Sequence, residues 1–574
     1  MSKVMILKAM ALIFLGVLLS AFLASDLWRS SYASPVSDFN TTFWNGSAEY
    51  PPLELEMTFS GNLTVGGVSV DEYDAFFSSH VYSGTLVRIH SILLKPPGDN
   101  LPAVLLLHDT NGSCLQLLDS GRALASQGYV VMLIDSPGCG LSTGPKPTPD
   151  AIANLTDGPF SAYIYHDVIA AKRALTVLSD LPYVDPDAIA VSGVSMGGVV
   201  TYILAAIDSR VKAAVPVVAS GYLDELLWGG SLTNLILPPG LGLGNQTLLD
   251  LLRYFDCRAY ASQLTSPTLV VAGTHDDFFF IEAVNKTYSL IRSEKALNIA
   301  PNAGQEALED EWISSAVIWL DHHLKGFVGT LPRAPLASAE PANFYTSIKI
   351  SLQETENANV SVFYRDGLPG SRWEEKELSD SDLIPMPFLP TTVSYYLGVK
   401  VNGTVVSTTP VYRISVVPSI FVASFVLLVS VGAVLLFNWR DEAYQNALAD
   451  GFGSLLFLVG LMVWTIASVA MTFPWIEFGG RTSVSLLELW DRYALHFPPF
   501  ALVLGGLFAS LLAYARRMWL GGTAMLITFG WVYFCIATFT ILGQSVFLSW
   551  GAYLVGVCIA VSFIIPALLK ILRG

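Results

Sequence analysis

The pattern of apolar and polar positions changes several times along the chain, and each change predicts a different kind of structure. Short alternating runs at residues 53–59 and 82–94 are typical of antiparallel strands. From residue 103 to about 326, short apolar runs alternate with helical patterns, which predicts a parallel sheet whose loops gather at one edge. Residues 331–412 return to alternation between Gly, Asn and Pro turns, so we expect a small all-β sandwich there.

Long apolar spans dominate the C-terminal part of the chain. Each is long enough to cross a bilayer as a helix, and they lie at about residues 416–437, 452–474, 497–515, 519–542 and 547–569. Residues 4–24 are also apolar, so residues 1–25 form either a signal anchor or a signal peptide. The basic residues that flank these segments all fall on one side of the predicted membrane, the inside: Lys3, Arg440, Arg516, Arg517, Lys570 and Arg573. We therefore expect a multi-pass protein of the cell membrane, with a cytoplasmic C-terminus and the bilayer as a partner.

Composition and charge agree with a membrane protein whose polar part is exported. Of the 574 residues, 52% are hydrophobic and 14% are charged, which departs from the soluble norm in the membrane direction. The net charge of -16 belongs mostly to residues before 413 and argues against nucleic acid as a partner. Nine Asn-x-Ser/Thr sequons predict a glycosylated extracellular part over residues 26–412; they begin at Asn40, Asn45, Asn62, Asn111, Asn154, Asn245, Asn285, Asn359 and Asn402. Cys114 and Cys139 could pair there and leave Cys257 free, but the sequence does not fix this pairing.

Residues 188–200 carry the main candidate for chemistry. A short β-branched run leads into Gly193-Val194-Ser195-Met196-Gly197 and continues as a helical pattern. A strand, a tight turn and a helix in this order predict a nucleophile elbow, in which a Cβ on a flanking glycine would collide with its neighbours. Ser195 is then the candidate nucleophile at the carboxyl edge of the sheet, although a serine in a purely structural turn would give the same pattern.

Several motifs together resemble the α/β-hydrolase superfamily over residues from about 50 to 326, particularly its dienelactone hydrolase, acetyl-xylan-esterase and prolyl-oligopeptidase-like branches. The matching motifs are the His108 loop, Asp135-Ser136-Pro137-Gly138, Gly193 to Gly197, Gly273-Thr274-His275-Asp276, Pro301-Asn302-Ala303-Gly304, and Trp319 to Gly326. The resemblance implies an α/β fold of the α/β-hydrolase type, with the apolar insertion at 220–264 as a cap. The expected domains are a linker at 26–50, the extracellular hydrolase-like domain at 51–330, a fibronectin-III-like β-sandwich at 331–412, and an all-α transmembrane bundle at 413–574.

The resemblance also implies roles for single residues. The superfamily order is serine, acid, histidine, which makes Ser195 the nucleophile and Asp276 the acid. Asp277 stays open as the alternative acid, and either aspartate could instead cap the following helix. The backbone N–H groups of Met196 and Thr110 are the expected oxyanion donors.

The position of the catalytic base departs from the family pattern. Gln305 stands where the family places histidine, and an amide cannot accept a proton at any useful pH. His275 and His108 remain as substitute bases. Asp109 stands where the family usually has glycine, and its carboxylate is unfavourable beside a developing oxyanion.

Two functions therefore stay open. One is a serine hydrolase that acts on esters or peptides with a degraded triad. The other is an inactive pseudo-hydrolase that binds a small ester or peptide ligand, or a membrane or surface protein, as a scaffold or complex component. Because the chain has no nucleotide-binding motif and no metal-ligand spacing, we expect no cofactor and no metal.

Overall fold

The structure is a computed structural model that describes most of the chain up to residue 416 and three short strands beyond it. The described residues are 34, 36–45, 50–228, 230–305, 312–327, 331–334, 337–342, 347–352, 359–365, 372–378, 381–385, 391–401, 403–416, 474–478, 482–485 and 546–548.

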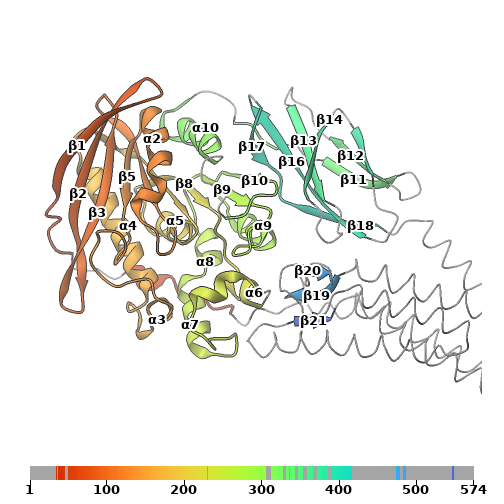
Figure 1. The fold of residues 1–574 in the computed structure, drawn as a ribbon, viewed down its shortest axis with the longest axis horizontal. Coiled ribbons are helices and arrows are strands. Elements are labelled where there is room, and N and C mark those ends of the chain that lie inside the picture. The colour runs from red at the N-terminus through yellow and green to blue at the C-terminus, as the bar shows by residue number, and fades with distance from the viewer. Residues whose placement is uncertain are drawn as a thin grey trace, which may run out of the picture.

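A nine-stranded mixed sheet forms the centre of the N-terminal domain (Figure 1), in the order β1-β2-β3-β5-β4-β7-β8-β9-β10. The first three strands are antiparallel: β1 (Glu56–Val65), β2 (Val68–Tyr82) and β3 (Thr85–Lys95). The other six are parallel to one another: β4 (Leu101–Leu107), β5 (Val130–Ile134), β7 (Val184–Val194), β8 (Val211–Val217), β9 (Thr268–Gly273) and β10 (Lys295–Ala300). This confirms the predicted α/β-hydrolase-like sheet, in which antiparallel strands lead into parallel ones.

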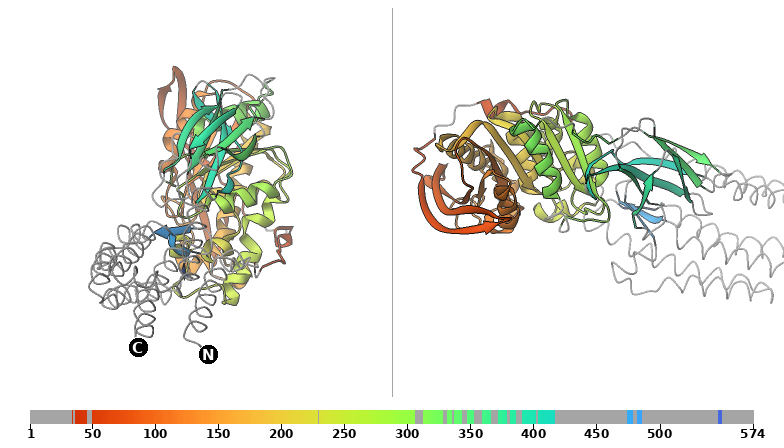
Figure 2. Two further views of the ribbon diagram at one scale, coloured as in Figure 1. Left: turned by 90° about the vertical axis from the view of Figure 1, so that its right-hand side faces the viewer. Right: turned by 90° about the horizontal axis from the view of Figure 1, so that it is seen from above.

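Helices cover both faces of this sheet (Figure 2), because alternate side chains of each strand point to opposite faces. On β4, Leu105 and Leu107 belong to one buried core, and Val104 and Leu106 belong to the other. The first core includes α4 (Tyr163–Asp180), α5 (Met196–Ile207) and α9 (Ile281–Leu290), and the second includes η2 (Cys114–Leu117), α2 (Leu118–Ser126) and α10 (Trp312–Leu324). A short helix α3 (Pro149–Ile152) and a short strand β6 (Thr156–Pro159) lie in the connection between β5 and α4.

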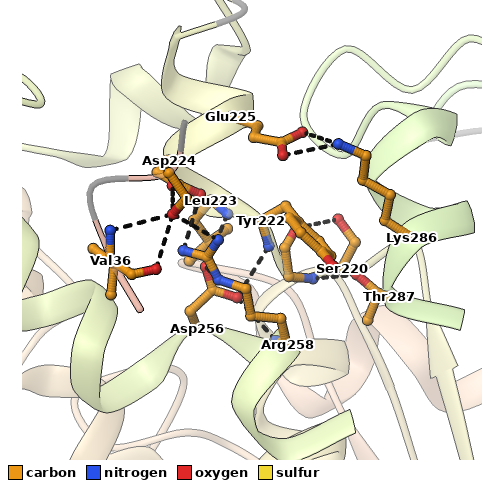
Figure 3. Close-up of polar contacts among 12 residues, drawn as sticks. Val36, Ser220, Tyr222, Leu223, Asp224, Glu225, Asp256, Arg258, Lys286 and Thr287 are labelled. Atoms are coloured by element: carbon orange, nitrogen blue, oxygen red, sulfur yellow. Dashed lines mark hydrogen bonds and ion pairs between the residues drawn. The ribbon is translucent and has the colours of Figure 1, made fainter. Parts of the chain in front are cut away.

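The predicted cap insertion folds as α6 (Leu223–Trp228), η3 (Leu232–Ile236), α7 (Gln246–Phe255) and α8 (Cys257–Ala261). Its polar centre is Arg258, which lies between two fully buried carboxylates (Figure 3), at 3.0 Å from Asp224 and 3.1 Å from Asp256. Beside this cluster, Lys286 of α9 pairs with Glu225 of α6 at 2.8 Å. Removing one partner of such a buried cluster leaves an uncompensated charge, so the Arg258 contacts hold the elements of the cap together, and the Lys286–Glu225 pair joins the cap to α9.

The described part of the predicted linker is packed on the domain. Trp44 of η1 (Thr42–Asn45) donates from Nε1 to the hydroxyl of Tyr260 at 2.8 Å, and its ring stacks on Tyr165. The N–H of Asn40 donates to the carbonyl oxygen of Arg253 at 3.0 Å. Residues 36–45 therefore form part of the surface of the cap.

A module of two antiparallel sheets follows the N-terminal domain and agrees with the expected β-sandwich. One sheet contains β11 (Ala337–Ala342), β12 (Ser347–Leu352) and β15 (Ser381–Pro385). The other contains β13 (Asn359–Arg365), β14 (Glu374–Leu378), β16 (Thr391–Val401), β17 (Thr404–Thr408) and β18 (Tyr412–Val416). Buried residues of both sheets, such as Ile350 and Val362, share one core.

This β-module docks on β10, the last strand of the large sheet (Figure 1). Thr408 Oγ1 donates to the carbonyl oxygen of Leu297 at 3.2 Å, and the Tyr396 hydroxyl donates to that of Ile299 at 3.3 Å. Nearby, the Asn285 amide donates to the carbonyl oxygen of Val411 at 3.2 Å. A glycan on Asn285 would stand at this contact between α9 and the β-module, and glycosylation of this sequon stays a prediction.

Beyond the module, β19 (Pro474–Phe478), β20 (Thr482–Ser485) and β21 (Val546–Leu548) form a three-stranded antiparallel sheet with β19 in the middle. The apolar segment at 4–24 and nearly all of the five predicted spans lie outside the described residues. Where helices are described, none combines the length and the apolar character needed to cross a membrane.

Candidate functional site

The nucleophile elbow has the geometry that the sequence predicts. β7 ends at Val194, α5 begins at Met196, and Ser195 between them has φ 56° and ψ -112°. Its N–H donates to the carbonyl oxygen of Val217 at 3.0 Å, which holds the turn against β8. A Cβ at Gly193 would lie 2.3 Å from the carbonyl oxygen of Gly197, so the strained turn depends on glycine. Ser195 is only 5% exposed.

Asp276, the predicted acid, lies in the loop after β9 and is also 5% exposed. Its Oδ1 accepts hydrogen bonds from the N–H groups of Phe278 and Phe279, at 2.8 and 3.0 Å. Its Oδ2 is buried and has no hydrogen-bond partner among the described residues. Burial raises the pKa of Asp276 to about 7, and the charges of Asp277 and Asp109 act in the same direction. The two backbone hydrogen bonds lower this pKa and offset only part of the effect.

The loop that carries Gln305 packs directly against the acid loop. The N–H of His275 donates to the carbonyl oxygen of Ala303 at 2.9 Å, and a Cβ at Gly273 would lie 2.3 Å from that same oxygen. The amide nitrogen Nε2 of Gln305 is buried, and no described residue accepts a hydrogen bond from it. The structure thus places two unsatisfied polar atoms, Asp276 Oδ2 and Gln305 Nε2, on adjoining loops.

The two histidines considered as substitute bases differ in how their ring nitrogens are engaged. His108 Nδ1 donates to the carbonyl oxygen of Asp109 at 2.6 Å, and its Nε2 accepts from the N–H of Ser136 at 2.9 Å. Since these partners use both ring nitrogens, His108 has no lone pair left for a serine proton. His275 Nδ1 lies 3.2 Å from Thr274 Oγ1, and this contact leaves the second ring nitrogen unassigned. His275 therefore stays open as a substitute base.

The predicted oxyanion donors differ in their surroundings. Met196 is the first residue of α5, where backbone N–H groups lack helical partners and can face an anion. The N–H of Thr110 instead donates to the Asp109 carboxylate at 2.5 Å. Because this carboxylate competes with any oxyanion for the same donor, Thr110 can serve only if Asp109 moves.

The cap reaches the acid loop directly. Ser231 Oγ donates to the carbonyl oxygen of Phe278 at 2.6 Å, and the N–H of Leu232 donates to that of Asp277 at 3.0 Å. Asp277 itself is exposed and points its backbone to the cap, whereas Asp276 is the buried member of the pair. Burial therefore distinguishes Asp276 from Asp277, and the role of Asp276 as the acid stays a prediction.

An open depression of about 780 Å³ lies beside the oxyanion loop. It is lined by Thr110, Asn111, Gly112, Ser113, Leu115, Gln116 and Gly140. Asn111 is exposed with φ 60°, so a glycan on this sequon would occupy the depression.

Cys114, Cys139 and Cys257 are free and buried, so the pairing of Cys114 with Cys139 considered from the sequence is not present.

One cluster of metal-ligating side chains was missed from the sequence. His90, Cys114 and Asp135 are all buried, and one donor atom of each lies within 4.8 Å of the others. The chain separates these residues widely, so no ligand spacing identifies them. In the part of the chain that the structure describes, this is the one such group, and it does not include Ser195 or Asp276.

Comparison with known proteins finds similarity to esterases over parts of the chain. The acetyl xylan esterase family matches residues 27–223, and the PhoPQ-activated pathogenicity-related protein family matches residues 242–367. Acetyl esterase Axe7A of Xylanibacter ruminicola is 26% identical over 188 residues, which are 30% of this chain. The match spans only 40% of the length of that esterase.

Two solved esterase structures are similar to part of this chain at low identity. Acetyl xylan esterase 1 of Thermoanaerobacterium sp. is 21% identical, and the alignment covers 47% of this chain and 87% of that one, with a TM-score of 0.40. The acetyl xylan esterase of Paenibacillus sp. R4 is 20% identical over 48% and 90% of the two chains, with a TM-score of 0.42. The strand order, together with the family matches and the curated relative, supports an esterase-like hydrolase of the α/β-hydrolase superfamily.

Proposed function

We propose that the N-terminal domain binds an ester or peptide ligand at Ser195 and turns it over poorly or not at all. The observation that carries this proposal is the pair of unsatisfied atoms, Asp276 Oδ2 and Gln305 Nε2, on the adjoining loops where the superfamily carries its acid and its histidine. A histidine there would donate to the carboxylate and accept the serine proton. The Gln305 amide has no basic nitrogen and cannot do the second task.

The size of the expected defect follows from the loss of the base. Removing one member of a serine triad lowers the rate by roughly 10⁴ to 10⁶. The Asp109 carboxylate on the N–H of Thr110 adds to the defect, because it opposes negative charge on the substrate oxygen. The strained elbow at Ser195 and the acidic loop are still formed, which suits a binding site that is similar to an esterase site.

An active hydrolase is the second candidate, and the ionisation of Asp276 favours it. Its pKa of about 7 lies where a general base works best at neutral pH, and its Oδ2 is unsatisfied. In this alternative, Asp276 would take the serine proton through a water molecule or a group of the substrate.

A fluorophosphonate probe separates the two candidates, because it reacts only with an activated serine. We expect no labelling of the detergent-solubilised full chain, labelling of Gln305→His, and none of the matched control Gln305→Ala. Labelling of the wild type that disappears in Ser195→Ala would refute the proposal and support the active hydrolase. No labelling of Gln305→His would contradict the idea that the missing base limits the site.

We further propose that the protein is anchored in the cell membrane with its N-terminal domain and β-module outside. The pairing of β19 with β20 and β21 supports this topology, because strands of one sheet must lie on the same side of a bilayer. The predicted topology places both 474–485 and 546–548 outside. In intact cells, a membrane-impermeant maleimide should label Asn62→Cys and should not label Arg573→Cys; the reverse result would contradict the topology.

Exposed sequons support glycosylation of this outer part. The exposed asparagines are Asn40, Asn62, Asn111, Asn245 and Asn359. Partners outside the cell would then be a small ester or peptide, or another surface protein that the cap and the β-module contact. Mass spectrometry of the intact chain before and after deglycosylation tests the modification, and an unchanged mass would contradict it.

A further inference from the structure

A buried cluster of three different donor types lies next to the oxyanion loop. His90 belongs to β3, Cys114 begins η2, and Asp135 follows β5 directly. The His90 Nδ1 atom lies 2.7 Å from Asp135 Oδ2 and 3.8 Å from Cys114 Sγ. All three residues are less than one tenth exposed. An imidazole nitrogen, a thiol sulfur and a carboxylate oxygen therefore converge on one point of the interior.

A fourth residue fixes the orientation of the histidine ring. His90 Nε2 bonds to Asp74 Oδ1 at 2.7 Å, so its Nδ1 atom is directed at Cys114 and Asp135. A carboxylate on the second ring nitrogen is the usual outer partner of a histidine that binds metal, because it holds the ring and the tautomer.

Backbone groups fix the Asp135 carboxylate as well. The N–H of Cys114 donates to Asp135 Oδ1 at 2.7 Å, and the N–H of Leu141 donates to Oδ2 at 2.8 Å. A Cβ at Gly140 would lie 2.0 Å from Oδ2, so only glycine leaves room beside this oxygen. Gly140 also lines the open depression, so the cluster lies close to the surface there.

The charge around the cluster favours a cation. Asp74 and Asp135 each form an ion pair with His90, and the structure gives them no other basic partner among the described residues. One imidazole thus serves two carboxylates, of which Asp135 is almost fully buried. Because two backbone N–H groups and His90 stabilise the charged form of Asp135, the cluster holds a preformed anionic ligand that could bind a divalent cation.

We propose that His90, Cys114 and Asp135 bind a zinc ion, with Asp74 as the outer partner of His90. Nitrogen, sulfur and oxygen donors suit Zn²⁺, whereas Ca²⁺ and Mg²⁺ require oxygen donors. The separations of 2.7 and 3.8 Å need only small side-chain shifts to bring each donor to about 2.0 to 2.3 Å from one ion. The ion would join β3, β5 and the loop of Thr110 to Cys114, on the side of the elbow where the oxyanion donor lies.

Metal binding to the detergent-solubilised full chain tests the site without an activity assay. After treatment with a chelator, we expect the wild type to bind about one Zn²⁺ per chain, measured by equilibrium dialysis with elemental analysis. Co²⁺ in the same site should give a sulfur-to-cobalt charge-transfer absorption, because Cys114 binds as a thiolate. Equal affinity for Ca²⁺ would contradict the donor set.

Matched variants show which residues hold the ion. Cys114→Ser should abolish the cobalt–sulfur absorption and weaken zinc binding at least tenfold, and Asp74→Asn should weaken it by roughly 10 to 100-fold. Cys139→Ser is the control, since Cys139 is also a free buried thiol but contacts Tyr163. Zinc binding that is absent in the wild type, or unchanged in Cys114→Ser, would overturn the proposal. If Cys114→Ser does not fold, the cobalt spectrum of the wild type still tests the proposal. A cobalt complex without the sulfur-to-cobalt absorption would show that Cys114 does not bind the metal.

Discussion

The buried Asp276 carboxylate makes a prediction about the stability of the N-terminal domain. In Asp276→Asn the side-chain oxygen can still accept from the N–H groups of Phe278 and Phe279, and the amide replaces the unsatisfied Oδ2. The substitution therefore removes the charge and keeps the hydrogen bonds that shape the acid loop. The only large change that depends on pH is the cost of ionising a carboxyl group that has no partner on one side.

The magnitude follows from the shift in the pKa of Asp276, from 3.8 to about 7. The folded pKa is raised, so the unfolded chain ionises first, and the folded state loses stability as the pH rises from about 4 through about 7. A shift of roughly 3 units is equivalent to about 4 kcal/mol, which is an upper value because the protein relaxes around the charge. We expect Asp276→Asn to be more stable than the wild type by about 2 to 4 kcal/mol at pH 8, and nearly equal to it at pH 4.

Urea unfolding followed by tryptophan fluorescence, at several pH values between 4 and 8, measures this difference. The control is Asp277→Asn, which removes the exposed neighbouring charge and keeps Asp276, so its difference in stability from the wild type should change little with pH. A difference between Asp276→Asn and the wild type that stays constant across this range would refute the reasoning. So would a variant that is less stable than the wild type at pH 8.

Three further substitutions test other parts of the structure. Gly197→Ala places a Cβ 2.3 Å from the carbonyl oxygen of Leu107, so we expect a loss of several kcal/mol in urea unfolding, on the order of 3 or more; a neutral effect would contradict the elbow geometry. Asp109→Asn removes a carboxylate beside the N–H of Thr110, and calorimetry should show boronate binding about fivefold tighter, or roughly 1 kcal/mol; weaker binding would refute the oxyanion argument. Arg258→Met leaves two buried carboxylates in the cap and should cost about 3 to 5 kcal/mol, against less than about 1 kcal/mol for the exposed control Arg333→Met; similar losses in both variants would contradict the packing described for the cap.

The elbow could be predicted because its causes are local. The glycines at 193 and 197, the serine between them and the change from strand to helix pattern all lie within a few residues, and the steric demand on each position is independent of the rest of the fold. The same holds for the parallel strands. A strand that is buried on both faces, such as Leu101–Leu107, has a short continuous apolar run, and this run predicts the strand.

The features that the sequence did not predict depend on contacts between distant residues. His90 had no motif context, yet β3 pairs with β5 and brings its ring to Asp135. The hydrogen bond from the N–H of Thr110 to the Asp109 carboxylate is local. Residue types alone do not predict it, because it depends on the conformation of the loop. Residues 36–45 resemble a polar linker because their anchoring partners, such as Tyr260, lie more than two hundred residues away.

The docking of the β-module on β10 limits how this chain can be shortened. β10 is an edge strand of the large sheet, and Asn298 on that strand also donates to the carbonyl oxygen of Val405 in the module. A chain that ended near residue 330 would uncover this edge and leave it open to pairing with another molecule. Truncation at the domain boundary expected from the sequence should therefore yield aggregates, and a cut after β18 is the better choice for a soluble fragment.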